Sequence, residues 1–286
     1  MKIRFWGVRG SIPSPGAGTV RYGGNTSCVA AEIGDDFIIF DAGTGLRLLG
    51  NHLLSRPKRP RIHLFISHVH WDHIQGFPFF APAYTAGFEI RVYGRGQADN
   101  TLGQILAGQM EGPNFPVSLD QLAAKISYRD LSAGDKLDLQ AQDGTPLASV
   151  HCVAGHHPNG VLMYRLQESA KGKSMVYATD TEHYEGRLDL DLARLAQGAD
   201  VLIYDGMYTP EEYEKNHKGW GHSTWEQGLA IVKKAEVRHL VVFHHDPSHD
   251  DEFLDKLHRD IRRTAQSEMP GVSVSMAIEG QTIELD

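Results

Sequence analysis

Short apolar runs recur along the chain, and six of them end at residues that can bind a metal ion or transfer a proton. β-Branched and aromatic residues dominate these runs, which therefore predict strands. The six are 37–40 before Asp41, 62–66 before His68, 149–153 before His156 and His157, 175–179 before Asp180, 201–204 before Asp205, and 240–243 before His244 and His245. Because polar residues follow six predicted strands, we expect a functional site at the edge of a sheet where the strands end.

Helical periodicity falls between these strands. Apolar residues at helical spacing predict helices over Trp225–Ala235 and 250–263, and residues 223–226 (Ser-Thr-Trp-Glu) fit a capping box at the start of the first. The segment 77–130 is rich in aromatic residues and proline, and it fits either a lid over the site or packing of a long connection. Because no low-complexity linker divides the chain, we predict one α/β domain over residues 1–286.

Composition narrows the class of protein. Of the 286 residues, 41% are hydrophobic and 22% charged, as in globular proteins with a sizeable core. The net charge of -8 argues against a long nucleic-acid footprint, although a local positive site could still take a small anion. Cys28 and Cys152 are too few for a disulfide framework. With no apolar run of signal-peptide or membrane-spanning type, we expect a cytoplasmic protein without membrane contact.

The hexad His68-Val69-His70-Trp71-Asp72-His73 places three imidazoles and a carboxylate in six residues, directly after a predicted buried strand. Each of these groups needs a polar partner when it is buried. A divalent metal ion satisfies them together, and histidine and aspartate are good ligands for zinc or manganese. The same desolvation argument disfavours the alternative of a histidine-rich surface loop, so the hexad predicts metal binding.

The hexad and several later motifs resemble the metallo-β-lactamase superfamily over nearly the whole chain. The later motifs are Asp41 in FDAGTG, His157 in HPNG, Asp180 in ATDTE, and His244. Within the superfamily the chain is most similar to the branch of ribonuclease Z and the phosphoribosyl cyclic phosphodiesterases, through residues 204–208, 221–224 and 243–246. The resemblance implies an α/β fold in four layers, an αββα sandwich with two central sheets between helices.

The resemblance also implies a site with two divalent metal ions per chain, zinc first and manganese or iron as alternatives. It assigns His68, His70 and His157 to one ion, Asp72, His73 and His244 to the other, and Asp180 to a bridge between them. The implied catalytic residues are Asp72, Asp41, Asp205 and His222. Metal-bound hydroxide would attack a phosphodiester while His222, oriented by Asp205, protonates the leaving oxygen. Asp41 would fix the tautomer of a ligand imidazole.

Some assignments keep alternatives. Asp41 and Asp205 also fit turn caps, and His222 fits a helix cap. The family motifs favour His244 over His245 and His157 over His156. The candidates for substrate contact are Arg9, Asn25 and His245, although a lone arginine is usually a solvated surface charge.

The spacing of the later motifs bears on the substrate. Only 22 residues lie between His157 and Asp180, which leaves no room for the long arm with which ribonuclease Z grips transfer RNA. We therefore predict a small or cyclic phosphodiester as substrate, such as a cyclic nucleotide or a phosphoribosyl cyclic phosphate. There are two alternatives. One is an enzyme that hydrolyses lactones, carboxylic esters or sulfate esters, and the other is a protein that senses a nucleotide by binding it without turnover. The resemblance also makes a homodimer possible.

Overall fold

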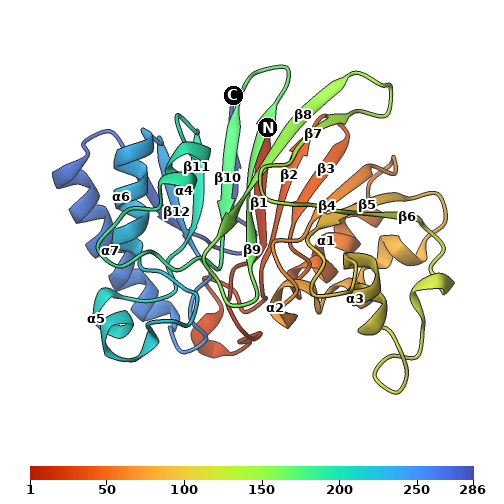
Figure 1. Ribbon diagram of the computed structural model, residues 1–286, viewed down its shortest axis with the longest axis horizontal. Coiled ribbons are helices and arrows are strands. Elements are labelled where there is room, and N and C mark those ends of the chain that lie inside the picture. The colour runs from red at the N-terminus through yellow and green to blue at the C-terminus, as the bar shows by residue number, and fades with distance from the viewer.

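Two seven-stranded sheets form the centre of the computed structural model, which describes residues 1–286 (Figure 1). The first sheet has the order β14 (Thr282–Glu284), β1 (Lys2–Gly7), β2 (Cys28–Ile33), β3 (Asp36–Phe40), β4 (Arg61–Phe65), β5 (Glu89–Gly94) and β6 (Lys125–Asp130). The second has the order β13 (Ser273–Met276), β12 (His239–Phe243), β11 (Val201–Asp205), β10 (Ser174–Ala178), β9 (Val161–Glu168), β8 (Pro146–Gly155) and β7 (Lys136–Gln140).

Helices cover the outer face of each sheet. The α-helices are α1 (Gly45–Leu54), α2 (Trp71–Ile74), α3 (Leu102–Gly108), α4 (Leu190–Leu195), α5 (Pro210–Glu212), α6 (Trp225–Ala235) and α7 (Asp251–Glu268). Four short 3-10 helices lie at Ala17–Thr19, Phe77–Phe79, Ala81–Tyr84 and Leu119–Gln121, and a π-helical turn at Tyr213–His217. Helix α1 flanks the first sheet, while α4, α6 and α7 flank the second (Figure 1). The predicted αββα sandwich is confirmed.

Three apolar layers follow from the alternation of side chains along the strands. Between the sheets, Phe5, Phe40 and Phe65 of the first sheet pack with Tyr177 and Phe243 of the second. The opposite faces of the same strands pack on the helices, as the period of two requires. Both sheets are thus buried on both sides over most of their width.

The predicted strands and helices agree with the observed ones to within a few residues. Helix α6 spans the predicted residues, and α7 continues five residues beyond the predicted end. The capping box is wrong: the N-cap is Thr224, which caps no backbone N–H through its side chain. The hydroxyl of Ser223 instead bonds Tyr204 and His183, both at 2.9 Å.

The segment 77–130 contributes mainly to packing. It supplies β5 and β6, which extend the first sheet in parallel to β4, and helix α3, which packs on β6. In β5, buried Ile90 and Val92 alternate with half-exposed Glu89 and Arg91. That pattern is typical of a strand with one buried face.

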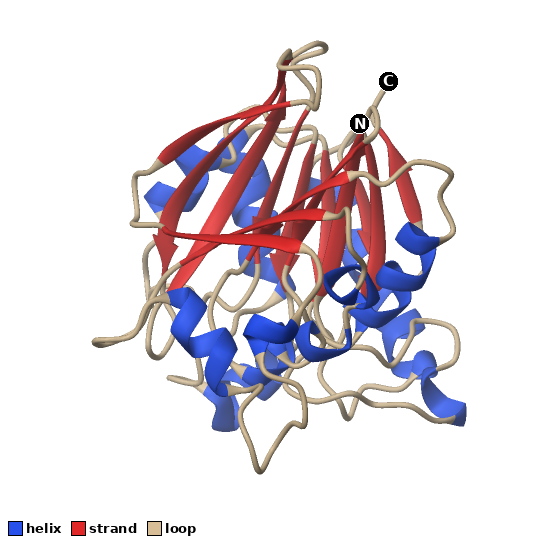
Figure 2. Ribbon diagram, turned by 90° about the vertical axis from the view of Figure 1, so that its right-hand side faces the viewer, coloured by secondary structure: helices blue, strands red, loops and turns tan.

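The topology brings the predicted site residues to one end of the molecule. Strands β3 and β4 run parallel in the first sheet, and β10, β11 and β12 run parallel in the second. Their carboxyl ends lead into the loops and short helices gathered at the end opposite the two termini (Figure 2). None of the helices is long and apolar enough to cross a lipid bilayer.

Candidate metal centre

Two groups of metal-ligating side chains meet between the carboxyl ends of the two sheets. The first ligand group is His68, His70 and His157. The second ligand group is Asp72, His73 and His244, and it is joined by Asp180. Within each group the nearest ligating atoms lie within 4.8 Å of one another. The structure therefore brings together all seven side chains that the sequence suggested as metal ligands.

The donor set fits divalent metal ions. His68 Nε2 is buried and has no hydrogen-bond partner, although buried polar groups are nearly always paired. Elsewhere ring nitrogens face each other: His157 Nε2 lies 3.2 Å from His70 Nδ1, and His244 Nε2 lies 3.3 Å from His73 Nε2. Cations placed among these lone pairs would satisfy all of them, and imidazole with carboxylate suits zinc, manganese or iron.

The carboxylate of Asp180 lies between the two groups. Its Oδ1 is 3.7 Å from His68 Nε2 on the side of the first ligand group. Its Oδ2 is 3.1 Å from His73 Nε2 and 3.2 Å from His244 Nε2 on the side of the second. One carboxylate oxygen thus faces each group, which is the arrangement that a bridging ligand requires.

Backbone conformation at the strand ends directs these side chains. Asp41 directly follows β3 and His244 directly follows β12, whereas one residue, Thr179, separates Asp180 from the end of β10. All three have positive φ, at 64°, 52° and 64°, a region that costs non-glycine residues energy. Left-handed residues of this kind cluster at functional sites, and here each one turns a polar side chain away from the strand direction into the gap between the sheets.

A buried network around Asp41 holds the second ligand group. Its Oδ2 accepts hydrogen bonds from His73 Nδ1 at 2.7 Å, from the Ser67 hydroxyl at 2.8 Å and from the Tyr177 hydroxyl at 2.8 Å. Its Oδ1 accepts from the Ser67 backbone N–H at 2.7 Å. A proton on Nδ1 of His73 leaves its Nε2 lone pair free to bind a cation. The contact with the carboxylate of Asp41 therefore favours the tautomer of His73 that a metal ligand needs.

Sequence reasoning did not identify Tyr177 and Ser67. Tyr177 lies inside β10, where its inward-facing ring reads as core, and Ser67 stands beside the hexad without a motif of its own. A hydroxyl in a fully buried strand was the available signal for Tyr177, because a buried hydroxyl needs a partner.

The variant Tyr177→Phe is expected to lose about 1.5–3 kcal/mol of unfolding free energy, since it removes a hydrogen bond to a buried carboxylate. Metal affinity should fall by about 10- to 100-fold, because the carboxylate that orients His73 loses a donor. Calorimetry of unfolding and metal titration measure the two effects. Tyr164→Phe is the matched control: that buried hydroxyl donates to the neutral carbonyl of Ile66 at 2.7 Å, so only stability should change. Equal metal affinities in both variants would contradict the expectation.

The loop after β1 closes over the second ligand group. The backbone N–H of Ser11 donates to Asp72 Oδ2 at 2.8 Å. Gly10 lies against His244, so that a Cβ built on Gly10 would stand 2.6 Å from the imidazole ring. A contact under 3 Å forces a neighbour to move, and here the neighbour is a candidate metal ligand.

We expect Gly10→Ala to displace His244 and to weaken metal binding at the second ligand group by about 10- to 100-fold. Gly16→Ala is the control on the same loop, because a Cβ there meets nothing within 4 Å. Isothermal titration with zinc compares the two variants, and thermal unfolding of the metal-free proteins separates ligand displacement from loss of fold. Equal zinc affinity in Gly10→Ala and Gly16→Ala would exclude the steric effect.

His222 stands between the two groups and Asp205. Its Nδ1 lies 2.9 Å from Asp205 Oδ2 and 3.8 Å from Asp180 Oδ1, and its ring stacks on His244 with centroids 5.0 Å apart. Asp205 Oδ1 also accepts from the backbone N–H of Met207 at 3.1 Å. One oxygen of Asp205 thus caps a turn while the other holds His222. His157 is fixed similarly, with Nδ1 2.9 Å from the carbonyl of Gly221.

In the metal-free site, the pKa of His222 shifts in the opposite direction from the pKa values of the first ligand group. Burial lowers the pKa of His68, His70 and His157, which keeps these imidazoles neutral and able to bind a cation. Burial also acts to lower the pKa of His222, but the carboxylates, Asp205 foremost, outweigh it and raise that pKa to about 9. The metal-free site therefore favours a protonated His222 and neutral imidazoles in the first ligand group.

The three residues predicted to contact the substrate all form hydrogen bonds within the protein. Arg9 is fully buried, and it donates to the carbonyls of Gly23, Asp246 and His249, so it joins loops and is no surface charge. The side-chain amide of Asn25 donates to Glu279 at 2.9 Å. His245 is buried, with Nε2 2.8 Å from the Ala277 carbonyl. Each of the three side chains has a protein partner in the structure, and a contact with substrate stays a prediction for all of them.

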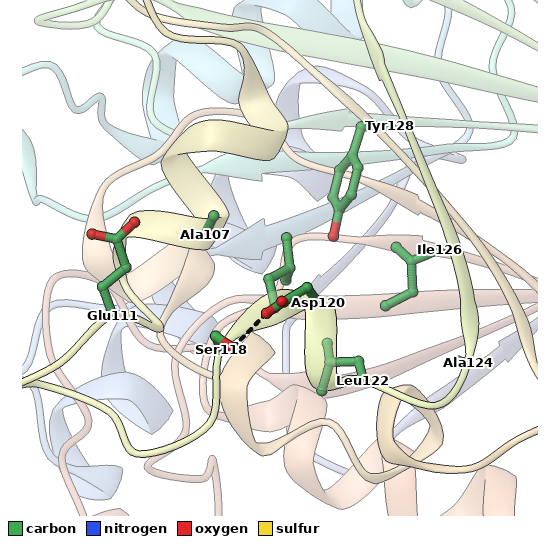
Figure 3. A pocket seen from close by; sticks show the side chains of 9 residues that line it. Ala107, Glu111, Ser118, Asp120, Leu122, Ala124, Ile126 and Tyr128 are labelled. Carbon is green, nitrogen blue, oxygen red and sulfur yellow. Dashed lines mark hydrogen bonds between the residues drawn. The ribbon is translucent and has the colours of Figure 1, made fainter.

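A hollow in segment 77–130 is a feature separate from the candidate metal centre. A hollow of about 540 Å³ lies between α3 and β6, and Figure 3 shows Glu111, Ser118, Asp120 and Tyr128 among the side chains around it. The Ser118 hydroxyl is hydrogen-bonded to Asp120 within this set. No histidine lines the hollow, and none of its residues belongs to either ligand group.

Comparison with known proteins places this geometry in a family. Residues 37–245 match the Beta-lactamase superfamily domain. Ribonuclease Z of Pyrococcus horikoshii is 23% identical, with 98% of this chain and 97% of that protein aligned. The metallo-beta-lactamase fold protein YhfI from Bacillus subtilis has a TM-score of 0.71 at 18% identity, covering 99% of both chains. A diphosphatase from the PhnP family has a TM-score of 0.67 at 16% identity, covering 100% of this chain and 98% of that one.

The family match spans most of the chain and includes the hexad, Asp41, His157, Asp180 and His244. The relatives align over nearly their full length, so the likeness extends to both sheets. The chain belongs to the beta-lactamase superfamily, and its sequence is similar to that of ribonuclease Z.

Proposed function

We propose that this metal-dependent hydrolase is a phosphodiesterase that cleaves small or cyclic phosphodiesters. One observation carries the proposal: the carboxylate of Asp180 offers one oxygen to each ligand group, and His222 lies beside it in a hydrogen bond to Asp205. A two-ion site next to a positioned acid matches the needs of phosphodiester hydrolysis. Those needs are charge neutralisation at the phosphoryl group, a nucleophile at neutral pH, and a proton for the leaving alkoxide.

The first ligand group would hold one ion, the second ligand group the other, and Asp180 would contact both. Divalent ions, when bound, supply positive charge at the phosphoryl oxygens and lower the pKa of water. Asp41 keeps His73 in the tautomer with a free Nε2, and Ser11 orients Asp72 through its backbone N–H. These contacts hold the ligands before a cation arrives.

His222 donates the proton to the leaving oxygen. Asp205 accepts from Nδ1, which leaves Nε2 as the position that gives up its proton. The burial of Asp205 keeps water from competing for its carboxylate. A poor alkoxide leaving group gains most from such an acid, which favours phosphodiesters over lactones as substrates.

RNA is the competing substrate, since relatives carry the name ribonuclease Z. Two features favour a small substrate. The residues between His157 and Asp180 form the antiparallel pair β9 and β10 with a short turn, so no arm protrudes there. The net charge of -8 is unfavourable for a long polyanion.

The test is hydrolysis of bis(p-nitrophenyl) phosphate by protein reconstituted with zinc, manganese or iron. Turnover that disappears in Asp72→Ala but persists in Asp191→Ala, an exposed aspartate on α4, supports the proposal. A nucleoside cyclic phosphate and a transfer-RNA precursor are then compared under the same conditions. Faster cleavage of the precursor would replace the small-substrate proposal with an RNA-processing one. Absence of phosphodiester turnover at full metal occupancy, with turnover of lactones or sulfate esters, would overturn it.

A further inference from the structure

Two of the four tryptophans are exposed, and both border the candidate metal centre. Trp71 is 82% exposed and Trp220 is 60% exposed, whereas Trp6 and Trp225 pack against the core. A third exposed apolar side chain next to the candidate metal centre is that of Ile12, which is also 60% exposed. We name Ile12, Trp71 and Trp220 the rim residues. Exposed apolar side chains gathered at one site are a common mark of binding.

Covalent neighbours connect each rim residue to the metal ligands. Trp71 stands between His70 and Asp72, which belong to different ligand groups. Trp220 precedes Gly221, whose carbonyl accepts the hydrogen bond from His157. Ile12 follows Ser11, whose backbone N–H donates to Asp72. The rim residues therefore come from three separate segments that converge on one cluster.

The indole of Trp220 is held in place despite its exposure. Its ring meets that of His217 edge-on at 5.0 Å, and His217 stacks on Tyr208 at 4.1 Å. Tyr208 in turn meets His222 edge-on at 5.9 Å. His217 ends the π-helical turn Tyr213–His217, a type of turn found frequently at functional sites. A chain of aromatic contacts thus fixes Trp220 relative to the proposed acid.

We propose that Trp71 and Trp220 bind a planar aromatic ring of the substrate, so that the phosphodiester is a nucleotide whose base stacks on the rim. This inference rests on the proposed phosphodiesterase function. Indole faces stack on nucleobases without regard to sequence, and each such contact contributes substantially to binding. A phosphate at the cluster and a base on the rim lie on adjacent parts of one small molecule.

A second copy of the chain is a weaker occupant of the rim. His70 and His157 are half-exposed beside Trp71 and Trp220, so a copy seated there would cover the approach to the ligands. A nucleotide on the rim residues would instead place its phosphate at the ligand groups. The molar mass of wild type and variants in solution distinguishes the two occupants.

The experiment compares adenosine 2′,3′-cyclic phosphate with methyl riboside 2′,3′-cyclic phosphate, which carries the same phosphodiester without a base. Trp71→Ala, checked for unchanged metal content, should raise KM for the adenosine substrate by roughly 5- to 150-fold and leave KM for the base-free one unchanged. Trp71→Phe should restore most of the loss. Trp220→Ala should also raise KM for the adenosine substrate. Leu190 is exposed on α4, and Leu190→Ala should change KM for neither substrate.

A binding measurement makes the inference independent of turnover. Adenosine monophosphate should quench the tryptophan fluorescence of the wild type, and the quenching should decrease in Trp71→Ala and in Trp220→Ala. If the metal-loaded wild type hydrolyses neither cyclic phosphate nor bis(p-nitrophenyl) phosphate, the proposed function fails, and quenching alone decides the inference. The inference is overturned, while the phosphodiesterase function stands, if the wild type has equal KM values for the adenosine and the base-free substrate and the variants leave the quenching unaltered. A dimer that becomes monomeric in Trp71→Ala without any change in quenching also overturns it.

Discussion

Replacing Asp180 by alanine is expected to abolish turnover and to reduce the metal content from two ions per chain to one or none. The carboxylate of Asp180 has one oxygen toward each ligand group, at 3.7 Å from His68 Nε2 and 3.1 Å from His73 Nε2. Loss of this carboxylate removes a ligand from both ions together, whereas loss of a residue that only orients a ligand costs about 10- to 100-fold. The effect on activity should therefore exceed 100-fold.

Charge reinforces that expectation. Asp180 is buried, which raises the pKa of its carboxyl, but His244 and the other imidazoles around it lower the pKa far more and keep it ionised. Without its negative charge, the cluster presents several imidazoles to two cations with only Asp72 to balance them. Elemental analysis after dialysis measures the ions per chain. Asp191→Ala is the control for a lost surface aspartate, and two tightly bound ions in Asp180→Ala would refute the bridging role.

The place of the candidate ligands in the fold could be predicted from sequence because they follow strands, and the resemblance supplied their assignment. Apolar runs locate β3, β4, β10, β11 and β12, and parallel strands bring their carboxyl ends to one edge. The choice between His244 and His245 needed the structure: one imidazole faces Asp180, and the other points back to Ala277. Adjacent residues after a strand diverge in direction, and the positive φ of His244 decides which one enters the site.

Long-range contacts account for what the sequence did not predict. Arg9 was expected near a phosphate, yet its guanidinium binds carbonyls from residues more than 200 positions away. Tyr177 reaches Asp41 across the two sheets, 136 positions apart in sequence. Neither partner has a local motif, because such contacts depend on how the sheets stack. Strands β5 and β6 were missed because the aromatic and proline-rich segment around them obscures their short alternating pattern.

The two ligand groups also differ in how they are supported. The first ligand group relies on His157 held by the Gly221 carbonyl and on His68 beside the Ser67 hydroxyl at 3.1 Å. The second is surrounded by Asp41, Tyr177 and the loop that carries Ser11. More buried polar contacts rigidify the second group, so its ion should dissociate more slowly than that of the first.

His222→Ala is expected to retain both ions and to lower kcat by about 10²- to 10⁴-fold on substrates with alkoxide leaving groups. The metal content should persist because His222 is bonded to Asp205, outside both ligand groups proposed for the ions. The loss arises because an alkoxide must take a proton as it departs. On bis(p-nitrophenyl) phosphate the variant should lose little, since p-nitrophenolate leaves without one. His151→Ala, a half-buried histidine on β8, controls for removal of an imidazole elsewhere.

The pH dependence of the wild type completes this test. The carboxylates around His222 raise its pKa to about 9 in the metal-free protein, and the residue donates only while it is protonated. Cleavage of the alkyl substrate should therefore be maintained below the pKa of His222 and decline as the pH rises through it; bound cations will shift that limb toward lower pH. The limb should vanish in His222→Ala and move down in Asp205→Asn, which keeps the shape of the partner but removes its charge. If the alkaline limb persists unchanged in His222→Ala, another group is the acid.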